Sequence, residues 1–232
     1  MQKGMVKNSK TGAAKRSGGA PRLRGKANEE EIRDAILTAA IGEFYEHGLG
    51  GARVDAIARR AKTNKRYLYL YVGNKQAIWL AALERVYEIM RAGERELKLE
   101  NLPPDEGMRL LIRFNFGFHV EHPEFISMLN DENRQKGRNV RRSAKAKKLY
   151  SPLLAMIERL LHRGEEVGLF RTGVDPMQLY ISIAALSYFY CSNQHTLSAI
   201  FGQNLGGRYE ILRREEHAVA VIMGYLARPS QN

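Results

Sequence analysis

The stretch that decides the fold runs from Arg53 to Lys75 and reads RVDAIARRAKTNKRYLYLYVGNK. Its apolar spacing predicts two short helices joined by a tight turn at Lys62–Asn64, with Leu68 as the inward anchor of the second helix. From Arg59 to Lys75 the stretch carries six basic residues and no acidic one. A short basic helix behind a supporting helix offers cations to phosphates and polar tips to base edges, so the pattern predicts a reader of the major groove of DNA.

Each candidate side chain in this stretch has a role set by its chemistry. Lys65 and Arg66 suit guanine or phosphate, although a solvated helix face is the plainer alternative. Tyr69 and Tyr71 can donate to phosphates or simply pack in the core, and Asn64 fits a helix N-cap as well as a groove contact. The candidate DNA-binding residues are Arg53, Thr63, Asn64, Lys65, Arg66, Tyr67, Tyr69, Tyr71 and Lys75.

Composition narrows the class of protein. The chain has 232 residues and a formal net charge of +12, which favours a polyanionic partner such as nucleic acid or anionic lipid. No apolar run approaches the roughly 20 residues that cross a bilayer, and none follows the basic N-terminus, so neither a membrane span nor a secretory signal is expected. The single cysteine, Cys191, excludes an internal disulfide and fits a reducing compartment, so we expect a cytoplasmic, nucleoid-associated protein.

The helix signals predict an all-α chain in three parts. Residues 1–28 hold eight Lys or Arg and no acid, which predicts a disordered basic arm that either touches DNA or only aids solubility. Residues 29–74, opened by an Asn28 cap, form a helix-turn-helix domain, and residues 75–232 a helical ligand-binding and dimerisation domain. About nine helices are expected, one after Asn64 and the others near 29–47, 54–61, 75–99, 106–121, 124–136, 149–167, 176–201 and 211–227.

The order and spacing of this stretch resemble the TetR family of bacterial transcriptional regulators. The resemblance covers about Glu29 to Met90 and rests on Ile57-Ala58, the turn Ala61–Asn64, the run LYLYV at 68–72, and Lys75. It implies a DNA-recognition helix after the turn.

Three residues depart from the family pattern. Lys62 stands where a Gly is usual, at a turn position that often has φ > 0, which costs a non-Gly residue about 1 kcal/mol. Arg53 replaces a capping Ser or Thr, and Val72 replaces Phe. The resemblance also supports Tyr71 as a phosphate contact.

A single recognition helix covers few base pairs, so a specific, near-palindromic operator needs two of them about 34 Å apart, held by a dimer. The resemblance implies a homodimer through the last two helices. Both helices are unusually apolar, although a purely internal core would also explain this. The apolar residues are Leu179, Ile181, Ile183, Ala184, Ala185, Leu186, Val219, Val221, Ile222, Met223, Tyr225 and Leu226.

The second half clusters aromatic and polar residues that suit a small-molecule pocket, or equally an aromatic core. HPEF at 122–125, GLFR at 168–171 and DPMQLY at 175–180 resemble the sensor domains of nicotinate-degradation repressors, and less closely of the pyrimidine-utilisation regulator. This implies a small aromatic or heterocyclic effector, with Arg138 or Arg142 free to meet an acid group. The candidate ligand-binding residues are Phe114, Phe118, His119, Phe125, Met128, Asn133, Arg138, Tyr188 and Asn193.

The expected function is therefore a dimeric repressor released from its operator by a small metabolite, with no cofactor. An activator or a metal-responsive regulator on the same fold is the alternative, since His119 with His122 and Cys191 with His195 share helix faces. An enzyme is not expected, because no phosphate loop, nucleophile elbow or paired carboxylates are found. A membrane-surface protein is not favoured either, because the basic arm has no apolar face.

Overall fold

The computed structural model describes residues 26–228, without the side chains of residues 26, 27, 147 and 149–151. The chain order is α1 Lys26–Gly51, α2 Val54–Arg60, α3 Lys65–Tyr71, α4 Lys75–Glu96, η1 Leu99–Asn101, α5 Pro104–Glu121, α6 Pro123–Arg134, η2 Val140–Arg142, α7 Ala144–Glu166, α8 Pro176–Phe201 and α9 Arg208–Leu226. Within these residues the helices are the only regular elements apart from one isolated bridge between Phe170 and Ala227. The all-α prediction is confirmed, and most of the predicted basic arm lies outside the described residues.

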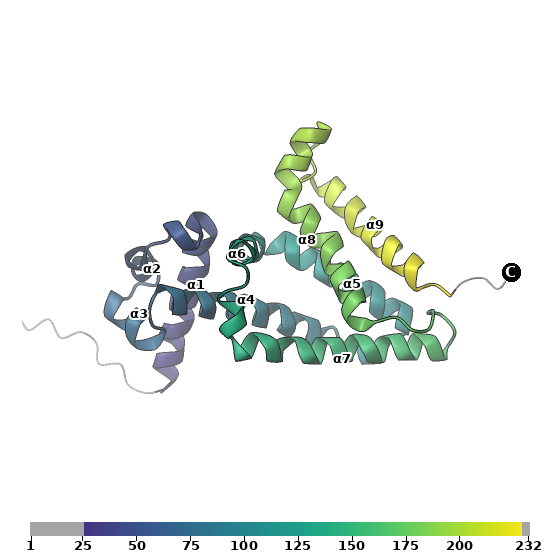
Figure 1. Ribbon diagram of the computed structural model, residues 1–232, viewed down its shortest axis with the longest axis horizontal. Coiled ribbons are helices and arrows are strands. Elements are labelled where there is room, and N and C mark those ends of the chain that lie inside the picture. Colours follow the sequence, from purple (N-terminus) through teal and green to yellow (C-terminus); the bar gives the residue numbers. More distant parts are fainter. Residues whose placement is uncertain (1–25, 229–232) are drawn as a thin grey trace, which may run out of the picture.

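Helices α1, α2 and α3 form the head of the molecule at one end, and α4 leads from it into the second half (Figure 1). The apolar faces of α1, α2 and α3 meet α4 around Phe44, Ile57, Leu68 and Trp79, which are all fully buried. Burying these large side chains supplies the main stabilisation of so small a unit.

Helix α1 is longer at both ends than predicted. It begins at Lys26 rather than Glu29, so Asn28 lies inside the helix and does not cap it. At the other end the chain kinks at Gly48, with φ of 63°, and resumes a helical turn to Gly51. A side chain at Gly48 would also lie 2.8 Å from Asp131 Oδ2, so glycine suits this position on two counts.

Helix α7 begins at Ala144, five residues before the predicted start. Ser143 caps it by accepting a hydrogen bond from the Ala146 backbone N–H at 2.8 Å. Within the basic stretch, Lys145 forms an ion pair with Glu88 of α4 at 2.7 Å. That pairing and the buried Ala146 extend the helix through the basic residues.

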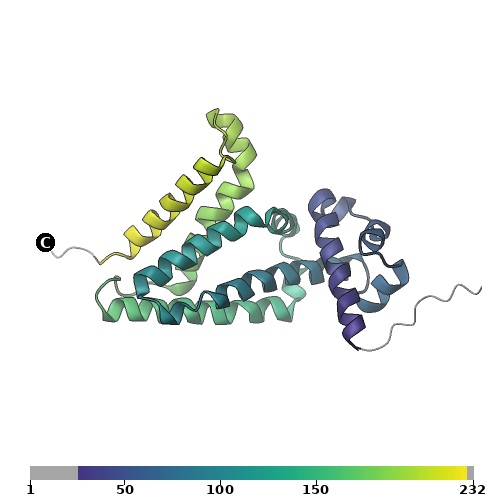
Figure 2. The same ribbon diagram turned by 180° about the vertical axis from the view of Figure 1, so that it is seen from behind.

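The second half packs α5, α7, α8 and α9 around a core that includes Leu111, Phe116, Ile157 and Ile183. Helices α8 and α9 run as a pair along the side away from the head, and the end of α8 with the start of α9 rises above the rest (Figures 1 and 2). Helix α6 lies between the two halves and packs against α1, α4, α5 and α8. Any change in its position therefore reaches the head directly.

Candidate DNA interface and sensor cavity

Helix α3 is fixed at its start and along its inner face. Asn64 caps it, because its side chain accepts a hydrogen bond from the Tyr67 backbone N–H at 3.1 Å. Leu68 is fully buried, whereas Lys65, Arg66 and Tyr69 lie on the exposed side of the helix. The predicted cap and anchor are confirmed, and a cationic face is presented to solvent.

The tyrosines of α3 divide between packing and exposure. Tyr67 and Tyr71 are half-buried and their rings stack, with centroids 5.7 Å apart. The carbonyl oxygen of Tyr71 accepts a hydrogen bond from Arg33 of α1 at 2.7 Å. Tyr69 is 50% exposed, so it is the most accessible of the three to a DNA backbone.

Two of the candidate lysines already have partners within the protein. Lys65 Nζ lies 3.1 Å from Asp55 of α2, and this hydrogen bond and charge raise the pKa of Lys65. Lys75 Nζ donates to the Gly50 carbonyl at 3.0 Å. By contrast, the side chains of Arg53 and Arg66 are exposed and form no ion pair with any described residue.

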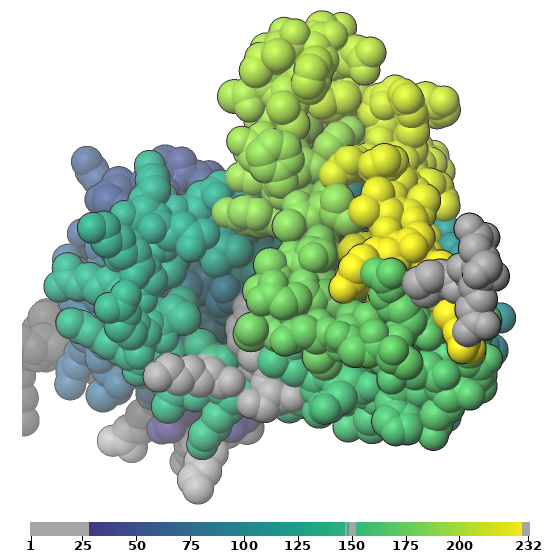
Figure 3. All heavy atoms as spheres, turned by 45° about the vertical axis from the view of Figure 1, so that its right-hand side comes forward, coloured from purple at the N-terminus to yellow at the C-terminus, as the bar shows by residue number. Residues whose placement is uncertain are grey.

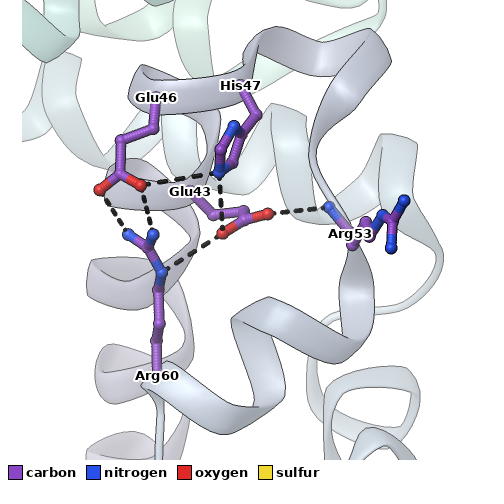
Figure 4. Close-up of polar contacts among 5 residues, drawn as sticks. All are labelled: Glu43, Glu46, His47, Arg53 and Arg60. Atoms are coloured by element: carbon purple, nitrogen blue, oxygen red, sulfur yellow. Dashed lines mark hydrogen bonds and ion pairs between the residues drawn. The ribbon is translucent and has the colours of Figure 1, made fainter.

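The start of α2 is held by carboxylates of α1 (Figure 4). Arg53 offers no side-chain cap, but its backbone N–H donates to Glu43 at 3.0 Å, while its guanidinium points away. Arg60 is bound by both Glu43 and Glu46. This basic residue therefore stabilises the head, and sequence reasoning missed the role of Glu43 because Glu43 lies on another helix.

The turn before α3 adopts the conformation that the sequence predicts. Lys62 has φ of 51°, in the left-handed region. Thr63 is half-buried beside it. The turn thus keeps the backbone shape of a glycine-containing turn while it carries an exposed cation.

The nine candidate ligand residues do not form one group. Phe118, Phe125 and Met128 are buried in the core shared with the head, and Phe114 packs against it. Asn133, in the last turn of α6, and Arg138, after the end of α6, are both exposed. Tyr188 donates a hydrogen bond to Asn130, and Asn193 donates one to the Phe189 carbonyl of its own helix. His119 is buried and lines a cavity.

This cavity has a volume of about 500 Å³ and lies between α5, α6 and the C-terminal half of α8, with one wall from α1. We call it the sensor cavity, after the ligand-binding role predicted for this half of the chain. Figure 3 shows the molecule notched between α6 and the rising end of α8. Sequence reasoning missed most of its wall, although the spacing of Cys191 and His195 was noticed. The lining residues are Tyr45, His119, Val120, Pro123, Ile126, Ser127, Asn130, Tyr190, Cys191, Gln194, His195, Gly206 and Ile211.

A chain of buried polar groups extends inward from the cavity. His119 Nδ1 lies 2.9 Å from Ser187 Oγ, and Ser187 donates to Asn115 Oδ1 at 2.8 Å. Burial, reinforced by the positive charge of Arg91, lowers the pKa of His119 to about 4. Arg91 itself pairs with Glu94 at 3.0 Å, and burial raises the pKa of Glu94 to about 7. His119 is therefore a neutral imidazole near pH 7.

Comparison with known proteins decides the family. Residues 36–82 match the family model described as bacterial regulatory proteins, tetR family. Residues 104–222 match the model described as tetracyclin repressor-like, C-terminal domain. The chain belongs to the TetR family of transcriptional regulators.

Its relatives are regulators and not enzymes, as expected. The TetR-family chain is 34% identical to the HTH-type transcriptional repressor NicS of Pseudomonas putida over 77% of this chain and 84% of NicS. It is 28% identical to the regulator RutR of Escherichia coli over 40% of this chain and 43% of RutR. These two relatives confirm the subgroup that the second half of the sequence resembles.

Solved TetR-family structures share the fold. The fatty acid degradation regulator FadR of Bacillus halodurans superposes with a TM-score of 0.65 at 19% identity, covering 84% of this chain and 97% of FadR. The ketosteroid regulator KstR2 of Mycobacterium tuberculosis superposes with a TM-score of 0.59 at 20% identity, covering 90% and 100%. Identities this low establish the shared architecture alone.

In this TetR-family chain two buried carboxylates of α6 join the sensor half to the head. Asp131 accepts a hydrogen bond from the Leu49 backbone N–H, past the kink of α1, at 2.9 Å. Glu132 accepts one from the Trp79 indole of α4 at 3.1 Å and others from the backbone of Asn139 and Val140. Asp131 and Glu132 therefore connect α6 to both α1 and α4.

Two features of the described residues bear on the alternatives. No three His, Cys, Asp or Glu side chains among them are grouped so as to hold a metal ion. None of the helices in residues 26–228 combines the length and apolarity needed to cross a bilayer.

Proposed function

We propose that the protein is a homodimeric repressor that binds a near-palindromic operator through two copies of α3 and leaves it when a small molecule occupies the sensor half. The observation that carries this is the exposed basic face of α3, held by the Asn64 cap and the Leu68 anchor. The repressor NicS, at 34% identity, supports the sign of regulation. An activator on the same scaffold is the second candidate.

The proposed division of labour follows the three parts of the chain. Residues 29–74 read DNA, residues 75–232 dimerise and sense the effector, and the basic arm at 1–28 adds phosphate contacts. Arg66 and Lys65 are proposed for base edges, and Tyr69 and Arg53 for phosphates, because their side chains are exposed. Lys75 and Tyr71 are proposed for phosphates at the start of α4 and the end of α3, with Thr63, Asn64 and Tyr67 at the rim of the contact.

The proposed dimer surface lies on α8 and α9. Ile181, Phe189, Val221 and Tyr225 are exposed there, and they flank an apolar hollow of about 670 Å³. Exposed apolar groups gathered on two adjacent helices are typical of a subunit interface. A four-helix contact between two copies would bury them and fix the spacing of the two α3 helices.

The deciding experiment is genome-wide mapping of the DNA bound by the full chain, followed by equilibrium binding to the recovered site and to random duplex. We expect a near-palindromic site bound at least a thousandfold more tightly than random duplex. Binding that shows no preference between the two duplexes at moderate salt would overturn the proposal. A rise in expression of neighbouring genes on binding would favour the activator.

Replacing Arg66 with Ala tests base reading by α3. Loss of a bidentate contact to guanine should cost about 1–3 kcal/mol on the operator and relax preference at one base step. Binding isotherms on operator and random duplex measure both effects. Arg159→Ala, which removes an exposed arginine of α7, is the matched control. If Arg66→Ala lost the same affinity for both duplexes, Arg66 would contact the phosphate backbone and not a base.

A further inference from the structure

The walls of the sensor cavity carry no carboxylate, ammonium or guanidinium group. None of its lining residues is Asp, Glu, Lys or Arg. Its buried ionisable groups are neutral as well, since burial lowers the pKa of His119 to about 4 and raises the pKa of Cys191 to about 11. The polar groups that remain are hydroxyl and amide side chains such as Ser127 and Gln194, together with the exposed imidazole of His195.

A charged ligand at the buried inner end of such a cavity, beside His119, would lose hydration without gaining a counter-charge. Removing an ion from water costs far more than removing a neutral polar group, unless an opposite charge or several hydrogen bonds replace the water. Among the cations of this half, Arg91 already pairs with Glu94 at 3.0 Å, and Arg214 donates to the Leu186 carbonyl at 3.2 Å. Arg138 lies on the exposed surface beyond α6. The cavity therefore favours an uncharged molecule over the acid that the sequence resemblance implied.

His119 sets the hydrogen-bonding preference at the inner end. Its Nδ1 faces Ser187 Oγ at 2.9 Å. Ser187 Oγ has two acceptors for its own proton, Asn115 Oδ1 at 2.8 Å and the Ala184 carbonyl at 3.1 Å. With its proton directed to either of them, Ser187 Oγ accepts from His119, which assigns the single proton of the neutral ring to Nδ1. Nε2 is then an acceptor, and no described residue donates to it.

We propose that the sensor cavity is the effector site and that it selects a small, uncharged ring compound whose N–H or O–H donates to His119 Nε2. The amide of Gln194 also lines the cavity and suits a carbonyl or ring nitrogen, whereas the amide of Asn130 already bonds Ser192 and Tyr188. Tyr45 of α1 and Ile126 of α6 also line the cavity, so a bound molecule would contact both helices of the α1–α6 contact between the two halves. The inference rests on the proposed effector-responsive function and names its ligand class.

Cys191 provides a direct reporter of occupancy, because it lines the cavity and is the one cysteine of the chain. The full-length protein is modified with methyl methanethiosulfonate, a small uncharged thiol reagent, and followed by intact mass. Four probes form two matched pairs. Benzamide and benzoate differ in charge, and phenol and anisole differ in whether they carry an O–H that can donate a hydrogen bond. We expect benzamide and phenol to slow modification at least fivefold at saturation, and benzoate and anisole to leave the rate unchanged.

Two variants separate the role of His119 in binding from a role in folding. In His119→Asn the amide can replace Nδ1 toward Ser187 but provides nothing at Nε2, whereas His119→Gln provides a polar atom near Nε2. Affinity for phenol should fall about tenfold in His119→Asn, the loss of one hydrogen bond, and less in His119→Gln. His162→Asn, on the exposed face of α7, should have no effect. Thermal melting establishes that each variant is folded.

The outcomes distinguish this inference from the proposed function. Protection of Cys191 by benzoate or anisole as strong as that by their partners, no protection by any probe, or unchanged affinity in His119→Asn would each overturn the inference. A compound that releases the operator while Cys191 stays reactive would also place the effector elsewhere, with the repressor function intact. Failure of the chain to bind any operator would instead overturn the function.

Discussion

Lys62 holds a left-handed backbone conformation, with φ of 51°, in the turn that aims α3. Replacing it with Gly should relieve this strain and raise the free energy of unfolding by about 0.5–1 kcal/mol, which is about 2–4 °C in Tm. Lys62→Ala removes the same charge and keeps the strain, so the difference between the two variants isolates the backbone effect. Equal melting temperatures for Lys62→Gly and Lys62→Ala would show that the turn is unstrained.

His119 should make folding stability depend on pH. Its folded-state pKa of about 4 lies below the ordinary value of 6.5, so the unfolded chain takes up a proton first as the pH falls. The free energy of unfolding should therefore decrease between pH 6.5 and pH 4. Thermal melts of His119→Asn should show a shallower decrease over this window, whereas His162→Asn, exposed on α7, should follow the wild type. Parallel curves for His119→Asn and wild type would show that His119 does not resist protonation.

At the residue scale, the sequence predicted the features that depend on near neighbours. The Asn64 cap and the buried Leu68 follow from a few consecutive residues, and the positive φ of Lys62 follows from the family resemblance, in which a Gly is usual at this position. It did not predict that Arg60 is bound by Glu43 and Glu46, because those partners lie on α1 and only the packing of α1 on α2 brings them together. A count of basic residues therefore overstates the charge available to DNA.

At the scale of elements, α6 is the connection between the sensor cavity and the head. Burial alone would raise the pKa of Glu132, but hydrogen bonds from Asn139, Val140 and Trp79 lower it overall. Glu132→Gln turns one acceptor toward these donors into a second donor, so it should destabilise the fold by about 2–4 kcal/mol. Denaturant unfolding measures the loss.

The same variant tests the coupling through α6. Without the bond between Glu132 and Trp79, saturating effector should weaken operator binding less in Glu132→Gln than in wild type. Glu96→Gln, on the exposed side of α4, is the control for both measurements. A stable Glu132→Gln protein with the full effector response would show that α6 acts on the head through other contacts.

Element boundaries were predictable where caps are strong. Helix α8 runs over Pro176–Phe201 as predicted, because Asp175 accepts bonds from the first backbone N–H groups and Gly202, with φ of 63°, ends it. The starts of α1 and α7 were missed for a different reason. Ser143 caps α7 within a basic stretch, and Glu88 of α4, which pairs with Lys145, lies far from it in the sequence.

At the scale of the whole molecule, the two halves share their aromatic residues in a way that spacing cannot reveal. Phe118, Phe125 and Met128 were expected to line a ligand pocket. They pack instead in the core that includes Leu68 of α3 and Trp79 of α4. An aromatic residue on an amphipathic helix suits a core and a pocket equally well. Which of the two it joins depends on where α6 crosses α1, and that is a tertiary property.

The proposed dimer is the property of the whole molecule on which the proposed operator binding depends. Val221 on α9 is 42% exposed within the proposed dimer surface, whereas Val167 at the end of α7 is 63% exposed outside it. Both positions accept a glutamate without disturbing a monomer, but Val221→Glu would bury two carboxylates in a symmetric contact, one from each copy. Sedimentation should show Val221→Glu as a monomer and Val167→Glu as a dimer.

Because a monomer presents a single α3, Val221→Glu should also lose most of its preference for operator over random duplex. Its melting temperature at low concentration should stay close to that of Val167→Glu. A dimeric Val221→Glu with full operator preference would require a different pairing of the two copies.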